Sequence, residues 1–328
     1  MSLLTPDRPI HPAINTTSPA GATTTTSTAG ASASTRRIDR GSIDLTHSEK
    51  RFGTRRLTAS VCLPARNEES TIGPLVRALR ETLLRDRVAD EVVVIDDRSS
   101  DFTANEAEMA GAVVHHSSSI LPEFGPSLGK GDALWRSVAA TTSDLILWCD
   151  ADLESVDFNR LGELLEVLRT DPHAMLVKGY FDRLDEHGQR TTGGRVTELA
   201  ARPLLALVAP QLGHIREPLS GMMAIRRSTA ELLPFDADYG VDVGLLLDTN
   251  RLFGPRSIRQ IGLGPLRHRN QPIESLAVQS GCVQRAILTR AGHHRSQLGG
   301  ALHRPDRDSA TLTTAQRPPL RSLLRKVN

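Results

Sequence analysis

Two aspartates that follow an apolar segment are the residues of this 328-residue sequence best suited to hold a metal ion. Asp150 and Asp152 end an unbroken apolar run, residues 145–149, which is typical of a strand covered on both faces. Residues two apart on an extended chain point to the same side, so both carboxylates can face one site. Because like charges so close need a cation, the pair predicts a site for a hard divalent ion that substrate phosphates share. The plainer interpretation is a solvated turn.

Two further polar segments also follow apolar runs. Segment 64–69 comes after residues 59–63, and segment 96–101 comes after residues 91–95. In an open α/β sheet, ligands bind beyond the carboxyl ends of the strands, where these segments would meet the two aspartates. Backbone N–H groups and side-chain oxygens there can bind a nucleotide. The alternatives are ordinary helix capping for the first segment and an Asx turn for the second.

A lysine between two glycines is the next candidate for phosphate chemistry. Lys130 lies between Gly129 and Gly131, directly before a predicted helix. The motif is not a P-loop, because the Gly-x4-Gly-Lys-Ser/Thr spacing is absent. Between residues 56 and 292 the only other lysine is Lys178, so the environment of each is of interest. The alternative for Lys130 is a surface lysine on a flexible loop.

A glycine-rich segment that opens a predicted helix can bind a second anion. Segment 192–197 combines helix N–H groups with Arg195, and the helix dipole adds to the attraction. Further along the chain, His268 lies between two arginines. Because cations lower the proton affinity of a histidine, His268 suits a ligand or a phosphate contact better than a general base. The alternatives are a glycine-rich turn and a structural or solvated histidine.

The elements that would position these residues alternate between strand and helix. Apolar runs predict strands over 59–63, 91–95, 112–115, 145–149 and 174–179, and helical spacing predicts helices over 71–84, 104–110, 132–140 and 158–168. This alternation predicts an α/β fold with a mostly parallel sheet and right-handed crossovers. From residue 189 the pattern is mixed, with helices over 196–207, 241–252 and 273–290 and strands over 219–225 and 258–263.

Composition limits the class of protein. The formal net charge is +2, but basic residues are concentrated near both ends and the middle of the chain is acidic, which argues against a nucleic-acid partner. No apolar run approaches the roughly 18 residues of a membrane span. The N-terminus lacks the apolar core of a secretory signal, so we expect a cytoplasmic protein without a membrane partner. The three cysteines match no zinc or redox spacing and are expected to be reduced and buried.

Two segments are too poor in apolar residues to join a core. Residues 1–55 include a stretch rich in Ser, Thr and Ala, and residues 293–328 are basic and contain several Pro and Gly. Such compositions cannot offset the entropy lost on ordering, so we predict two flexible tails. Residues 320–324 are the part of the second tail that could dock weakly.

Taken together, these motifs resemble the retaining glycosyltransferases typified by glucosyl-3-phosphoglycerate synthase, which have the GT-A fold. Three segments carry the resemblance most specifically: Gly-Lys-Gly-Asp-Ala-Leu-Trp-Arg-Ser at 129–137, Thr-Gly-Gly-Arg-Val-Thr-Glu-Leu at 192–199, and His-Arg-Asn at 268–270. The resemblance implies a Rossmann-like, mostly parallel central sheet with a smaller mixed part. Residues 56–190 would bind the nucleotide sugar, and residues 191–292 would bind the acceptor and supply a closing helix.

The resemblance also implies a role for each matching residue. Those that would line the donor nucleotide and its sugar are Pro64, Ala65, Asn67, Glu68, Asp97, Lys130, Asp150, Ala151, Tyr239, Gly240 and Asp242. Those that would hold the acceptor are Gly194, Arg195, Val196, Thr197 and Asn270. Asp152 and His268 would bind Mg²⁺ or Mn²⁺. The typical member is a dimer, so a homodimer is implied as well.

Four departures from the family pattern bear on the donor and on the sugar. They are Arg66 for an apolar residue, Asp96-Asp97-Arg98-Ser99 for an Asp-Ser-Gly-Ser turn, Asp242 for Glu, and Leu266-Arg267, which shifts an arginine by one position beside His268. They bear on the identity of the nucleotide and sugar more than on the fold or the reaction type.

We therefore predict a metal-dependent, retaining glycosyltransferase with UDP-glucose as the favoured donor and a small phosphorylated acid, such as 3-phosphoglycerate, as acceptor. Asp152, Lys130, Asp242 and Arg267 would carry the chemistry, with the ion acting as a Lewis acid on the leaving diphosphate. Attack on the same face of the sugar is favoured over a covalent intermediate, because no pair of carboxylates obviously brackets a sugar ring.

Three alternatives stay open. A member of the same family in secondary metabolism would move an unusual sugar from a UDP or GDP donor to a small hydroxyl or thiol acceptor. A nucleotidyltransferase would share the α/β core, but it should carry a Gly-rich loop with Arg or Lys in place of segment 64–69. A catalytically silent nucleotide-binding regulator is disfavoured, because Asp152 and His268 are both present.

Overall fold

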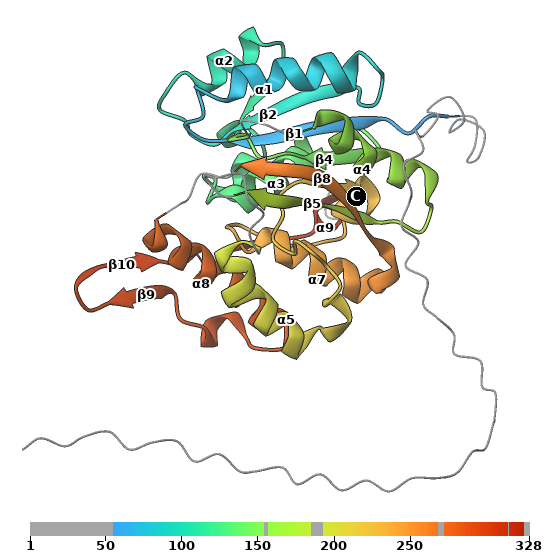
Figure 1. The fold of residues 1–328 in the computed structure, drawn as a ribbon. Coiled ribbons are helices and arrows are strands. Elements are labelled where there is room, and N and C mark those ends of the chain that lie inside the picture. The colour runs from blue at the N-terminus through green and yellow to red at the C-terminus, as the bar shows by residue number, and fades with distance from the viewer. Residues whose placement is uncertain (1–54, 154–156, 185–192, 268–271, 314, 325–328) are drawn as a thin grey trace, which may run out of the picture. The chain divides into compact units, whose positions relative to one another are not determined.

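The computed structural model describes residues 55–153, 157–184, 193–267, 272–313 and 315–324. Its central feature is a seven-stranded sheet in the order β3-β2-β1-β4-β6-β5-β8 (Figure 1). The strands are β1 (Ala59–Ala65), β2 (Glu91–Asp96), β3 (Val113–His116), β4 (Leu145–Trp148), β5 (Leu176–Leu184), β6 (Met223–Arg226) and β8 (Ile258–Arg267). β6 runs antiparallel to β4 and β5, and the other neighbours are parallel. The predicted α/β fold with a mostly parallel sheet is confirmed.

Helices cover both faces of this sheet because successive strand residues point to opposite sides. Val61 and Leu63 belong to the core that includes residues of α1 (Ile72–Leu79) and α4 (Phe158–Thr170). Cys62 belongs to the core that includes residues of α3 (Lys130–Ala140) and α7 (Val241–Phe253). Figure 1 shows α1 and α2 (Thr103–Met109) on one side of β1 and β2, and α5 (Arg202–Val208), α7 and α8 (Ile273–Arg290) on the other. Burial on both faces explains the unbroken apolar run at 145–149.

Short elements connect these layers. They are the π-helical turns η2 (Arg80–Leu84) and η5 (Thr197–Ala201), the 3-10 turns η3 (Ser117–Ser119), η4 (Pro122–Phe124), η6 (Pro210–Leu212) and η7 (Pro255–Ser257), the helix α6 (Arg227–Ala230) and the strand β7 (Phe235–Asp236). The helix predicted over 196–207 is divided into η5 and α5. The strand predicted over 219–225 begins only at Met223, because Ser220 closes a turn by donating its N–H to the Glu217 carbonyl at 3.1 Å.

The C-terminal segment corrects the prediction of a flexible tail from residue 293. Its described part contains η8 (Arg295–Gln297), a hairpin of β9 (Ala301–Arg304) and β10 (Arg307–Thr311), β11 (Gln316–Arg317) and α9 (Leu320–Leu324). β11 pairs with β7, Leu320 is buried in the core, and Trp135 Nε1 donates to the Pro318 carbonyl at 2.9 Å. The prediction is wrong because it considers only the low content of apolar residues. This segment is held largely by hydrogen bonds and by a buried arginine.

That arginine leads to a stability prediction. Arg317 contacts the carboxylate of Asp132, which is fully buried, and it donates to the carbonyls of Phe124 at 2.8 Å and Pro126 at 3.2 Å. We expect Arg317→Ala to lower the free energy of unfolding by about 3 kcal/mol, because it leaves a buried carboxylate with one guanidinium fewer. Urea unfolding measures this, with the exposed Arg321→Ala as control. Equal stability of the two variants would show that Arg317 is not part of the core.

Three further sequence predictions concern the N-terminal tail, the absence of a membrane span and the state of the cysteines. Residues 1–54 of the predicted N-terminal tail lie outside the described residues. In the described part of the chain, no helix has both the length and the apolar character needed to cross a membrane. Cys62, Cys149 and Cys282 are buried and form no disulfide, as predicted.

Candidate functional site

The turns after β1 and β2 are joined by hydrogen bonds at the carboxyl edge of the sheet. The Asn67 N–H donates to Ser99 Oγ at 3.0 Å, and the Ser100 N–H donates to Asn67 Oδ1 at 2.8 Å. The Glu68 N–H donates to Thr103 Oγ1 at 2.7 Å, at the start of α2. The two turns that we predict to bind the nucleotide therefore form one connected structure.

Asp97 follows β2 and lies beside the end of β1. Its N–H donates to the carbonyl of Ala65, which follows Pro64 in β1, at 2.8 Å. Its buried carboxylate accepts from Ser117 Oγ at 3.3 Å and lies 3.2 Å from Arg98 Nε. Arg98 has a φ of 59°, a left-handed conformation that favours glycine, and glycine is the family residue at this place in the turn. An arginine thus holds a left-handed conformation at the place where the resemblance implies a glycine.

Lys130 joins two acidic residues from distant parts of the sequence. It is the first residue of α3. Its Nζ lies 2.9 Å from Asp150 Oδ1, beyond β4, and 3.1 Å from Asp242 Oδ2, in the first turn of α7. Burial alone would lower the pKa of Lys130, but the two carboxylates outweigh it and raise the pKa well above its usual value. Lys130 is therefore a permanent cation at this edge of the sheet.

Gly221 leaves the space that this ion pair occupies. A Cβ at this position would lie 2.4 Å from Lys130 Nζ and 2.5 Å from Asp150 Oδ1. The partly exposed Tyr239 is within reach of the same charges: desolvation raises the pKa of its hydroxyl, Lys130 opposes the rise, and Asp150 and Asp152 add to it. Residues from α3, from the end of β4, from the approach to β6 and from the approach to α7 thus converge on one place.

Two glycines next to this cluster are required by the packing of the protein itself. A Cβ at Gly131 would lie 1.8 Å from the Asp236 carbonyl oxygen in β7, so only glycine lets α3 start so close to that strand. A Cβ at Gly240 would lie 2.8 Å from Ala286 Cβ and 3.0 Å from the Cys282 carbonyl oxygen, both in α8. Gly240 therefore supports the start of α7 by letting α8 approach it closely.

The acidic end of β4 has the chemistry of a hard metal site. Ala151 is buried, whereas Asp152 is exposed. Burial raises the pKa of the Cys149 thiol, and the negative charges of Asp150 and Asp152 raise it further, so both carboxylates act on the same place. Their oxygens are the donors that Mg²⁺ and Mn²⁺ prefer. Within the described ranges no three His, Cys, Asp or Glu side chains form a metal site, and His268 lies outside those ranges. The residues present fit an ion that takes further ligands from substrate.

The predicted acceptor segment leads into η5. A Cβ at Gly194 would lie 3.0 Å from a guanidinium nitrogen of Arg183, so this glycine lets the segment approach the end of β5. Arg195 is exposed, Val196 packs against the core, and Thr197 is buried. Arg195 is thus the residue of this segment whose side chain is most open to an anion from solvent.

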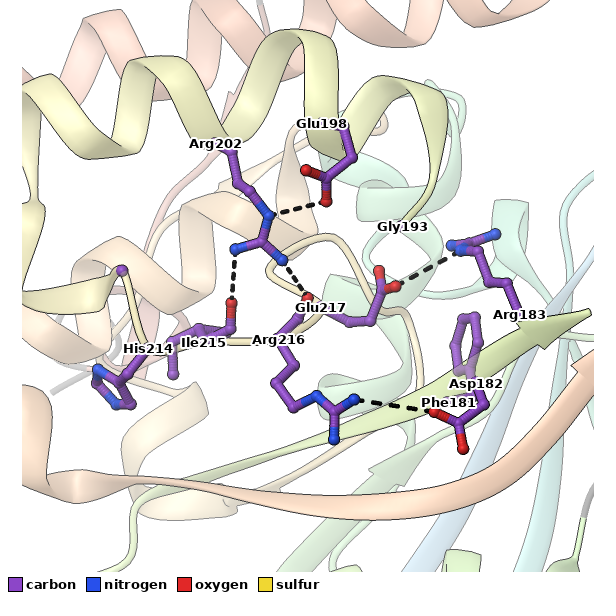
Figure 2. A pocket seen from close by; sticks show the side chains of 11 residues that line it. Phe181, Asp182, Arg183, Gly193, Glu198, Arg202, His214, Ile215, Arg216 and Glu217 are labelled. Atoms are coloured by element: carbon purple, nitrogen blue, oxygen red, sulfur yellow. Dashed lines mark hydrogen bonds and ion pairs between the residues drawn. The ribbon is translucent and has the colours of Figure 1, made fainter. Parts of the chain in front are cut away.

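A cavity of about 400 Å³ lies beside this segment, between β5, η5 and residues 213–217 (Figure 2). Each of three arginines in its wall contacts a carboxylate: Arg202 with Glu198 at 2.8 Å, Arg183 with Glu217 at 3.5 Å, and Arg216 with Asp182 at 3.8 Å. The wall is therefore charge-balanced, unlike a ready-made phosphate site. Apart from Glu198, which lies in segment 192–199, the sequence gives no signal for these residues, because no motif joins them.

The remaining site residues fall at or beyond the limits of the described structure. Arg267 is the last residue of β8. His268 and Asn270 lie outside the described residues. Conversely, the sequence offers one signal for a residue that the prediction omits: Gly221 interrupts an apolar run, a pattern that indicates a close backbone approach.

Comparisons with known proteins agree with this geometry. The family model for glycosyl transferase family 2 matches residues 60–233. The glucosyl-3-phosphoglycerate synthase of Mycolicibacterium smegmatis is 41% identical over 274 residues, 81% of this chain and 90% of that protein. The synthase of Petrotoga mobilis is 40% identical over 235 residues, covering 70% of this chain and 72% of that protein.

The similarity extends to solved structures. A crystal structure of the Mycobacterium tuberculosis synthase in complex with Mn²⁺, UDP-glucose and phosphoglyceric acid has a TM-score of 0.74 and 39% sequence identity to this chain. The match covers 81% of this chain and 91% of that one.

A mostly parallel sheet that gathers acids, an amide and one lysine at the carboxyl ends of its strands, together with these comparisons, defines a nucleotide-sugar-dependent glycosyltransferase of GT-A fold. The chain belongs to glycosyl transferase family 2. The resemblance on which the prediction of fold and enzyme class rests is confirmed.

We expect Gly221→Ala to impair sugar transfer without unfolding the protein. The added methyl would meet the ends of two side chains rather than backbone, so the Lys130–Asp150 pair can shift at little cost in stability. A displacement of this kind at a reacting centre can cost about 10²-fold, so kcat should fall by about that factor at an almost unchanged Tm. Steady-state kinetics and thermal unfolding check this, with Gly300→Ala, in open space, as control. A wild-type kcat in Gly221→Ala would contradict the expectation that the Lys130–Asp150 pair lies at the reacting centre.

Proposed function

We propose that this glycosyltransferase transfers glucose from UDP-glucose to the hydroxyl of 3-phosphoglycerate, with Mg²⁺ or Mn²⁺. The observation that carries the proposal is the contact of Lys130 with Asp150 and Asp242 at the carboxyl edge of the sheet. It is supported by 39% identity to a synthase whose crystal structure holds Mn²⁺, UDP-glucose and phosphoglyceric acid.

On this proposal the donor lies across the edge formed by β1, β2 and β4. Pro64, Ala65, Asn67 and Glu68 would line the nucleoside, and Asp97 would lie at the base. The permanent charge of Lys130 would offset the charge that grows on the diphosphate as the sugar leaves. Asp150 and Ala151 would contact the nucleotide sugar, and Tyr239, Gly240 and Asp242 would lie at the sugar itself.

Asp152 and His268 would hold the ion. When bound, the ion would act as a Lewis acid on the leaving diphosphate. Asp150 contacts Lys130, and Asp152 is exposed at the same strand end, where the diphosphate would lie on this proposal. Arg267, next to His268 in the sequence, would add positive charge on this side.

The acceptor would lie at the start of η5. Gly194, Val196 and Thr197 would present backbone N–H groups, and Arg195 would offer its two-pronged guanidinium to a phosphate or carboxylate. Asn270 would contribute from the other side. The neighbouring charge-balanced cavity does not compete for the same anion, because its arginines contact carboxylates.

We infer that the sugar keeps its configuration through attack on the same face. The bond between sugar C1 and the donor phosphate oxygen breaks, and the acceptor oxygen bonds to C1. The acceptor proton passes to the released phosphate oxygen, and UDP departs. Asp242 is buried and bound to Lys130, so it suits the orientation of sugar hydroxyls better than covalent attack.

One observation favours a second candidate, a family member that uses a GDP donor or an unusual sugar. The buried carboxylate of Asp97 and the neighbouring Arg98 replace the small residues of the family turn. A carboxylate can accept hydrogen bonds from the amino group of guanine, which uracil lacks. Asp242 is one methylene shorter than the Glu of the family pattern, and this difference also favours the second candidate.

The test is a panel of initial rates with Mn²⁺. UDP-glucose and GDP-glucose are each combined with 3-phosphoglycerate, glycerol 3-phosphate and neutral hydroxyl acceptors. We expect UDP-glucose with 3-phosphoglycerate to be fastest. A preference for GDP-glucose would favour the second candidate, and no product with 3-phosphoglycerate from any donor would rule out the synthase reaction.

The homodimer and the cytoplasmic location stay predictions.

A further inference from the structure

Lys178 is a buried lysine to which neither the donor nor the acceptor assignment gives a role. It lies in β5, and its side chain is almost completely buried, with 1% of its surface exposed. Its Nζ donates to the Ser220 carbonyl at 2.7 Å and to the Asp242 carbonyl at 3.5 Å, and it contacts Met223 Sδ at 3.8 Å. The ammonium therefore bridges the segment before β6 and the first turn of α7.

Both bridged segments border the group formed by Lys130, Asp150 and Asp242, here called the Lys130 cluster. Ser220 precedes Gly221, whose backbone lies so close to the Lys130–Asp150 pair that a Cβ would collide with it. Asp242 contributes its carboxylate to Lys130 and its carbonyl to Lys178. A change in the position of either segment would thus change the geometry of the cluster directly.

This arrangement is costly, which argues for a role beyond packing. Burial lowers the pKa of Lys178 to about 8, although the charges of Asp242, Asp150 and Glu217 oppose the decrease and that of Lys130 adds to it. An apolar side chain of similar length would avoid the loss of hydration. Among the described residues, the ammonium contacts two carbonyls and a thioether, and a cation in such surroundings is explained if it supports the site.

We propose that Lys178 is a positioning residue for sugar transfer: it ties Ser220 to the start of α7 and so holds Gly221 and Asp242 against Lys130 and Asp150. The inference rests on the proposed role of the Lys130 cluster at the donor. On this proposal Lys178 would act through Ser220 and Asp242 and not by contact with substrate.

The first test compares Lys178→Met with the wild type. The variant keeps the side-chain length and removes the ammonium. We expect kcat with UDP-glucose, 3-phosphoglycerate and Mn²⁺ to fall at least about tenfold, because the catalytic geometry loosens, while Tm stays equal or rises. The Kd of 3-phosphoglycerate should be unchanged. Lys178→Gln, which keeps an N–H donor without the charge, should recover part of the lost kcat.

Arg226→Met is the matched control. Arg226 lies at the opposite end of β6 and also donates to carbonyls, those of Ala174 at 2.8 Å and Leu168 at 2.5 Å. Its removal should lower Tm and leave kcat unchanged. If instead Lys178→Met and Lys178→Gln both lower Tm as Arg226→Met does, and keep kcat, Lys178 is structural and the proposal is overturned. Failure of both Lys178 variants to fold overturns it as well.

The pH profile gives a second readout that a structural role would not change. At a pH below the pKa of Lys178, the two positive charges of Lys178 and Lys130 balance the two negative charges of Asp150 and Asp242. At a pH above it, Lys178 is neutral, and these four residues together carry one net negative charge next to an anionic donor. Wild-type kcat/KM for UDP-glucose should therefore fall about tenfold between pH 7 and pH 9, and the profile of Lys178→Met should lack this decrease. A decrease of the same size in the variant would overturn the proposal.

Lys130→Met, measured in parallel, separates this inference from the function on which it rests. If Lys130→Met is active, the donor assignment fails. If Lys130→Met is inactive and Lys178→Met has wild-type kcat and pH profile, only the positioning role of Lys178 fails.

Discussion

Lys130→Met should lower kcat/KM for UDP-glucose by about 10³-fold or more. Lys130 Nζ contacts Asp150 and Asp242, and its removal leaves two carboxylates, with no lysine between them, facing the place proposed for the diphosphate. Repulsion then replaces attraction where charge develops in the transition state. Steady-state kinetics at saturating 3-phosphoglycerate measure the loss, with Arg77→Met, exposed on α1, as control.

The pH dependence adds a check on the same residue. Because the two carboxylates raise the pKa of Lys130 well above its usual value, no loss of activity between pH 6 and pH 10 should come from its deprotonation. Lys130→Arg should recover part of the activity, since it keeps the charge but not the compact ammonium. An activity within a few-fold of wild type in Lys130→Met would show that the cluster is structural.

Asp152→Ala should abolish metal-dependent transfer, with kcat reduced by about 10³-fold or more, while the protein stays folded. Asp152 is exposed beyond β4, so its loss leaves the apolar core intact. Asp152→Asn should be nearly as damaging, because an amide keeps the shape of the side chain but loses the charge that holds a divalent ion.

Two measurements test the prediction for Asp152→Ala. Calorimetric titration of Mn²⁺ in the presence of UDP should lose its signal, and Tm should be unchanged; the exposed Asp86→Ala serves as control. Undiminished Mn²⁺ binding and turnover in Asp152→Ala would remove Asp152 from the metal site.

The sequence predicts the edge of the sheet well because its signals are local. Apolar runs followed by the polar residues Asn67, Asp97 and Asp150 mark the carboxyl ends of β1, β2 and β4, and these ends do meet. It does not predict that Lys130 contacts Asp242, because 112 residues separate the two and only the packing of α3 against α7 brings them together.

Other features that the sequence does not reveal share this physical reason. Residues 293–328 look flexible by composition, yet Arg317 contacts the buried Asp132 across the fold. The sequence also does not show that the missing side chains of Gly131 and Gly240 make room for the backbone of β7 and for α8. Lys178 stands out in the sequence only by its rarity, and its contacts appear only once β5 lies beside β6 and α7.

The most direct test of the proposed reaction is an NMR analysis of what the full chain makes from UDP-glucose, 3-phosphoglycerate and Mn²⁺. We predict a single glucosylated phosphoglycerate whose anomeric proton shows the small coupling of an α-glucoside, formed in equal amount with UDP. That result would establish donor, acceptor and retention together. A β-glucoside would contradict attack on the same face, and the absence of any glucosylated phosphoglycerate would contradict the synthase reaction itself.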